Sequence, residues 1–139
     1  MTSGVERFEF EGKLFAIVIR KTYCSEGTDF LTGPESLLQL GILTHKKNAE
    51  INPHIHKKLP RTVDKTSEVL HILEGKIDVD FFSEDGKILG KTILNGGDTI
   101  LLSDGGHGFR MLEDARILEV KQGPYTGVGN DKTPIQKHG

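Results

Sequence analysis

The sequence predicts an all-β fold, either a barrel or a sandwich, on three observations. Seventeen glycines and five prolines among 139 residues indicate many turns. Apolar residues almost never recur at the period of an α-helix. Between residues 68 and 121, strand-like segments follow one another with turn signals about 8–12 residues apart. This spacing is typical of one antiparallel β domain.

The first part of the chain contains two predicted strands with a loop between them. Leu14–Arg20, which reads LFAIVIR, is rich in β-branched and aromatic residues, and Leu37–Thr44 follows as a second strand. The turn formers between residues 24 and 34 predict a loop. Pro53 ends any helix before the short segment HIH, and a charged loop then occupies residues 57–67.

The strand pattern is clearest after residue 67. Apolar residues alternate with charged ones in KIDVDFF, residues 76–82, as expected for a strand buried on one face. Asp85-Gly86 predicts a tight hairpin, because glycine accepts a positive φ without steric cost. The strands predicted in this region cover residues 68–74, 76–82, 87–94, 98–102, 107–112 and 115–121.

Composition bounds the class of protein. One domain fits the length, with N-terminal strands and a loop in residues 1–36, a core in 37–122 and an arm in 123–139. The net charge is −2 and no basic stripe with aromatics appears, which argues against nucleic acid. Apolar runs of at most six residues argue against a membrane span. The single cysteine, Cys24, and an N-terminus without an apolar signal core lead us to expect a cytoplasmic protein.

His54-Ile55-His56 is the main chemical signal. Residues i and i+2 of a strand point to the same face, so two imidazoles placed in this way can converge on one ion. Glu68 opens the next strand and His107 opens a later one. Three imidazoles and one carboxylate suit Fe, Mn, Ni or Zn as a divalent ion. We therefore predict a metal site at His54, His56, Glu68 and His107.

These residues resemble the two motifs of the cupin family. His54-x-His56 and Glu68-x6-Gly75 resemble the first motif, and GGDTILLSDGGHGF, which contains Gly97, Gly105 and His107, resembles the second. The resemblance spans about residues 37–121 and implies a cupin-type double-stranded β-helix, the jelly-roll barrel, around one metal ion. It also implies a homodimer, for which an unpaired Leu14–Arg20 edge would be suitable.

The chain departs from the cupin motifs at several positions. Eleven residues separate His56 from Glu68, where the family usually has three or four. Lengthening a surface hairpin costs little entropy, so the ligands need not move. Asn48 stands where the first motif has glycine, and Ser103 stands where the second has proline.

Other polar residues have two interpretations. Gln39 and Glu119 differ in parity from their apolar neighbours, which fits either an outward-facing residue or, with Glu68, an acid/base group in a pocket. Lys57 and Arg61 are either part of a solvated loop or a binding site for an anionic substrate. His71 lies three residues after Glu68 and therefore faces away from it on a strand.

Three functions remain open from sequence. The first is a metal-dependent enzyme acting on a small oxygen-rich metabolite such as a sugar derivative, an isomerase or epimerase on the family resemblance, with a dioxygenase as the alternative. The second is a non-catalytic module that binds a small molecule such as a sugar. The third is a structural partner protein, a function that does not explain the set of histidines.

Overall fold

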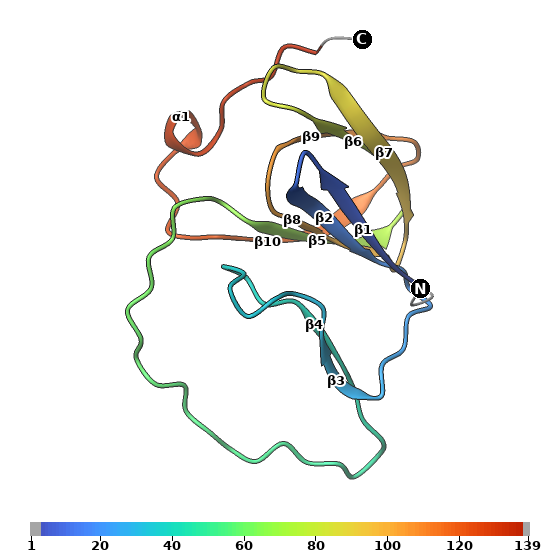
Figure 1. Ribbon diagram of the computed structural model, residues 1–139. Helices are drawn as coiled ribbons and strands as arrows, with labels where there is room; N and C mark the ends of the chain where they lie inside the picture. The colour runs from blue at the N-terminus through green and yellow to red at the C-terminus, as the bar shows by residue number, and fades with distance from the viewer. Residues whose placement is uncertain (1–3, 138–139) are drawn as a thin grey trace. The chain divides into compact units, whose positions relative to one another are not determined.

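The computed structural model describes residues 4–137 and contains ten strands and one short helix in that range (Figure 1). Their bounds are β1 (Val5–Phe10), β2 (Lys13–Ile19), β3 (Gly27–Phe30), β4 (Gly41–Thr44), β5 (Glu68–Glu74), β6 (Lys76–Phe82), β7 (Ile88–Asn95), β8 (Thr99–Leu102), β9 (Gly106–Met111), β10 (Arg116–Lys121) and α1 (Val128–Asp131). The chain forms two compact units. The larger unit contains residues up to 23 and from 66 onward, and the smaller contains residues 24–65.

Two antiparallel sheets make up the larger unit. One has five strands in the order β1-β2-β8-β5-β10, and the other has three in the order β7-β6-β9. The all-β prediction is therefore confirmed. Within the described residues neither sheet closes into a barrel, and β10 and β9 are each an edge of their sheet. The strand predicted as Leu14–Arg20 is β2, which lies between β1 and β8, so the expectation of an unpaired edge there is wrong.

The core lies between the inner faces of these two sheets. Ile100 pairs with both Val18 and Leu70, which puts the three side chains on one face of the five-stranded sheet. Ile77, Val79 and Phe81 of β6 are fully buried on the inner face of the other sheet. The buried members of the core cluster are Phe15, Ala16, Val18, Leu70, Ile72, Ile77, Val79, Phe81, Leu94, Ile100 and Leu102.

Arg20 ties the two sheets together at the end of β2. Its guanidinium donates to the backbone oxygen of Ile93 on β7 at 2.7 Å and to Asp98 Oδ2 at 3.1 Å. It also forms an ion pair with Glu6 at 2.5 Å. These partners raise the pKa of Arg20, with the hydrogen bond to Glu6 as the largest cause. The guanidinium therefore remains charged and bonded at both sheets.

The smaller unit consists of one hairpin and a long irregular segment. β3 pairs with β4, and the buried Ser25 hydroxyl donates to the backbone oxygen of Gly27 at 2.8 Å beside them. β3 was not predicted, and β4 covers only the end of the predicted strand 37–44, because Gln39 is engaged in a turn. Residues 45–65 have no regular secondary structure.

The prediction that His54 and His56 lie on a strand is wrong. Both residues are in the irregular segment 45–65 and both are exposed. Pro53 and Pro60 have no backbone N–H to donate to a sheet ladder. The segment also has no partner strand among the described residues.

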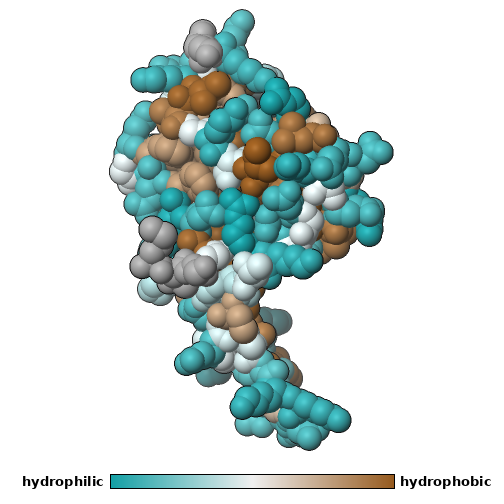
Figure 2. All heavy atoms as spheres, turned by 90° about the vertical axis from the view of Figure 1, so that its right-hand side faces the viewer, coloured by the Kyte–Doolittle hydropathy of each residue, from teal (hydrophilic) through white to brown (hydrophobic). Residues whose placement is uncertain are grey.

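The surface is mostly hydrophilic on the face shown in Figure 2, where apolar atoms form separate small groups. Among residues 4–137, no helix has the length and apolar content needed to cross a bilayer.

Candidate functional site

Glu68 and His107 meet in the larger unit, although 39 positions separate them in the chain. Glu68 begins β5 on the same face as the buried Leu70, so its carboxylate points to the inner side of the five-stranded sheet. His107 pairs in register with Phe81, which is fully buried on the inner face of β6. Nε2 of His107 lies 3.3 Å from Oε1 of Glu68, and their side chains are 27% and 14% exposed.

Two further charged side chains join this pair from β10. Lys121 pairs with Glu68 in the sheet register, and Glu119 pairs with Leu70, so both belong to the inner face. The neighbouring Leu118 is 53% exposed on the outer face. Glu119 thus faces the same side of the sheet as Glu68 and Leu70, and it is exposed at the edge strand.

The pKa values of Glu68 and Glu119 are shifted in opposite directions. The hydrogen bond with His107 lowers the pKa of Glu68 to about 2, against the effect of burial, and a hydrogen bond with Glu119 acts in the same direction. The pKa of Glu119 is raised, first by its hydrogen bond with Glu68 and then by desolvation. Glu68 is thus held ionised, and Glu119 takes up a proton more readily than an ordinary glutamate.

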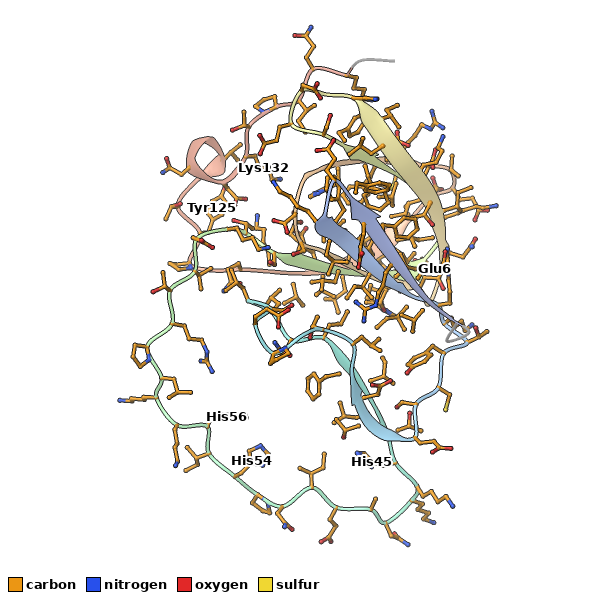
Figure 3. The ribbon with its side chains drawn as sticks, viewed as in Figure 1. Glu6, His45, His54, His56, Tyr125 and Lys132 are labelled. Carbon is orange, nitrogen blue, oxygen red and sulfur yellow. The ribbon has the colours of Figure 1, made fainter. Side chains whose placement is uncertain are left out.

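His54 and His56 form a second pair, within the smaller unit. Their ring centroids are 5.1 Å apart, and Figure 3 shows them along the irregular segment. Nδ1 of His54 donates to the backbone oxygen of Asn52 at 2.8 Å. In the neutral imidazole this hydrogen bond places the proton on Nδ1 and leaves Nε2 as the acceptor atom.

The Glu68–His107 pair has the spacing of two ligands of one divalent ion. Ligand atoms about 2.1 Å from an ion and at right angles to each other are about 3.0 Å apart, and a tetrahedral angle gives about 3.4 Å. The 3.3 Å between Glu68 and His107 falls in this range. In the described part of the chain, however, no three histidine, cysteine or acidic side chains are grouped closely enough to hold an ion. Each unit thus brings together two of the four predicted ligands.

The remaining residues singled out in the sequence lie in the irregular segment, in a turn, or on the face of β5 opposite Glu68. Lys57 and Arg61 are exposed on the irregular segment. Gln39 donates to the backbone oxygens of Gly33 and Ser36 at 2.9 Å and 3.0 Å, which gives it a structural role in a turn. His71 lies on the opposite face of β5 from Glu68, where its Nδ1 is 2.9 Å from the Thr99 hydroxyl.

Two side chains near the pair were not predicted from sequence. Asp131 of α1 accepts a hydrogen bond from the Thr66 hydroxyl at 3.0 Å and one from Lys121 Nζ at 3.1 Å. The alternation Glu119, Lys121 in β10 was a usable signal for Lys121. Asp131 lies in a glycine- and proline-rich tail, where no periodicity points to a contact.

Comparisons with known proteins add no relative. No protein-family model, no curated protein and no solved structure matches this chain. The resemblance to cupins therefore depends on the motif residues alone.

Proposed function

We propose that this chain is a cupin-like metalloprotein in which Glu68, His107, His54 and His56 bind one divalent ion, Fe, Mn, Ni or Zn. The observation that carries the proposal is the contact between Glu68 and His107 at 3.3 Å, made by two residues that the motifs single out. The pair occupies the inner side of an all-β unit, where neighbouring strands hold both side chains in position.

The residues of the site have distinct tasks in this proposal. Glu68, whose pKa is lowered to about 2, supplies an ionised ligand at neutral pH. His54 offers Nε2 because its Nδ1 is bonded to Asn52. A bound ion of this kind supplies a Lewis acid that polarises a carbonyl or hydroxyl group. Glu119, with its raised pKa, takes up or returns a proton beside Glu68.

The substrate class we propose is a small oxygen-rich metabolite such as a sugar derivative. The support is the family resemblance together with polar groups that can orient hydroxyls, chiefly Glu119 and Lys121 on the inner face of β10. Lys57 and Arg61 would add positive charge for an anionic substituent.

Metal analysis of the purified protein tests this proposal. The chain is purified without chelator or a nickel column, and its metals are counted by inductively coupled plasma mass spectrometry. We expect about one equivalent in the wild type and a loss of most of it in His54→Ala/His56→Ala and in His107→Ala. His45→Ala, an exposed histidine at the start of the same segment, is the matched control and should retain the metal.

The variants also test whether the two pairs share an ion. If the double variant loses the metal while His107→Ala keeps it, His54 and His56 bind without the pair of the larger unit, and the four-ligand site is wrong. Absence of metal from the wild type, also after incubation with each ion, would remove the metalloprotein proposal altogether.

A further inference from the structure

The C-terminal segment of the larger unit runs from one sheet to the other beside the Glu68–His107 pair. After β10 the chain turns through α1 and continues toward the start of β9 (Figure 1). We call residues 124–135 the strap. The strap contacts the rest of the unit at two places. One place adjoins Glu68 and the other adjoins His107.

The first fastening is at the Glu68 end. Asp131 accepts hydrogen bonds from Thr66 and Lys121 at 3.0 Å and 3.1 Å. Thr66 lies two residues before Glu68, and Lys121 pairs with Glu68 across the sheet. Asp131 and Lys121 are 12% and 24% exposed, so the ion pair is partly shielded from solvent. The Lys121 ammonium also lies 5.2 Å from the ring centroid of Tyr125, within the strap.

The second fastening is at the His107 end. Ile135 packs so closely on Gly106 that a Cβ on this glycine would lie 2.2 Å from Cδ1 of Ile135. Gly106 is the residue before His107. Thr133, Pro134 and Ile135 line one side of a cavity of about 370 Å³ whose other side is formed by Glu84, Gly105 and Gly106. The strap therefore leaves a space beside the start of β9.

We propose that the strap is a closing element over the Glu68–His107 pair, and that the bonds of Asp131 to Thr66 and Lys121 are its latch. The strap joins the β10 side of one sheet to the β9 side of the other, and among residues 4–137 both strands are sheet edges with no further strand beyond them. Release of the latch admits a ligand to the pair, and closure excludes water. The ligand part of this inference rests on the proposed function.

Chemical modification of His107 tests the strap without requiring metal. Metal-free protein is treated with diethyl pyrocarbonate, and the rates at His107 and His71 are followed by peptide mass spectrometry. Asp131→Asn should raise the rate at His107 by about threefold or more, because loss of the latch charge increases local opening. His71, on the opposite face of β5, should keep its rate. Asp114→Asn, an exposed carboxylate on the turn before β10, is the matched control.

The outcomes separate this inference from the proposed function. Unchanged modification of His107 in both Asp131→Asn and Thr66→Val overturns the strap, whatever the metal analysis shows. Equal acceleration at His107 and His71 also overturns it, because that result indicates general loosening of the fold. If the wild type holds no metal but His107 alone is modified faster in the variants, the strap stands and the metal proposal fails. If metal is bound, its loss to chelator should accelerate in the same variants.

Discussion

Glu68 is a predicted ligand that the structure places in contact with a second predicted ligand, His107. Its position at the start of a predicted strand and its spacing to Gly75 single it out in the sequence. Parity does not assign a role to Glu119, because the outer face of the edge strand β10 also carries the apolar residues Leu118 and Val120. It was also insufficient for His54 and His56, because two histidines in alternation do not reveal whether a partner strand exists.

The pKa of Glu68 has a consequence for stability at low pH. Its ordinary value is 4.5 and its value in the fold is about 2, so the ionised form stabilises the native state above pH 4.5. This contribution is lost as the pH falls from 4.5 through 2. The raised pKa of Glu119 has the opposite effect on stability. It favours the native state at low pH, where the group is protonated, and disfavours it at higher pH.

We predict that Glu68→Gln lowers the free energy of unfolding of the metal-free protein at pH 7 by about 1 kcal/mol. The difference from the wild type should shrink between pH 4.5 and pH 2. Denaturant unfolding at several pH values measures it, with Glu113→Gln, an exposed carboxyl group, as the control. A difference that grows toward low pH would contradict the assignment of the bond with His107 as the stabilising contact.

The individual strands show which parts of the fold short sequence patterns can predict. The predicted strands from residue 68 onward are present as β5 to β10, because turn residues and alternating apolar residues give the same boundaries. β1 was missed because only Phe8 and Phe10 of VERFEF are apolar on its inner face, where they pack near Phe81. The predicted barrel needs strand pairing between edges that are distant in the chain, and no local pattern determines that pairing.

Gly75 connects the two sheets at a position that leaves no room for a side chain. It lies between β5 and β6 with φ +99°, and a Cβ there would be 2.3 Å from the backbone oxygen of Asp114. We predict that Gly75→Ala lowers the free energy of unfolding by about 2 kcal/mol or more, because both the φ angle and the backbone contact oppose a side chain. Thermal unfolding measures this loss.

The control for this substitution is Gly129→Ala in α1, where the added Cβ meets no atom within 4 Å apart from its chain neighbours and the helix's own backbone. It should leave the midpoint of unfolding nearly unchanged. Equal effects of the two substitutions would show that the crowding at Gly75 is relieved by a small backbone shift.

The two units of the chain differ in how they are built. The larger unit has a core between two sheets, whereas residues 45–65 of the smaller unit have no regular structure and expose Ile55 to 94%. Segments with few buried contacts open at low free energy, so they are the first sites of proteolysis. This segment also contains His54 and His56.

We predict that trypsin first cuts the native chain between residues 46 and 61, at exposed lysine and arginine positions, at least about tenfold faster than within a strand. Adding Zn²⁺ should slow cleavage after Lys57 and Lys58, which adjoin His56, more than cleavage after Lys46. Mass spectrometry of the early fragments measures both effects. First cuts at Lys76 or Lys91, inside β6 and β7, would contradict the assignment of the segment as the least protected part of the chain.

The pairing of β2 with β8 has a consequence for the order of events during synthesis. Ile17 pairs with Leu101, so one neighbour of the apolar strand β2 is translated roughly 80 residues later. At about 5–20 residues per second this delay is roughly 4–16 seconds. During that time β2 has only the β1 hairpin as a partner, and a two-stranded hairpin is marginally stable in water. The apolar segment Phe15–Ile19 of the nascent chain therefore waits several seconds outside the ribosome, where chaperones can bind it, before β8 completes the sheet.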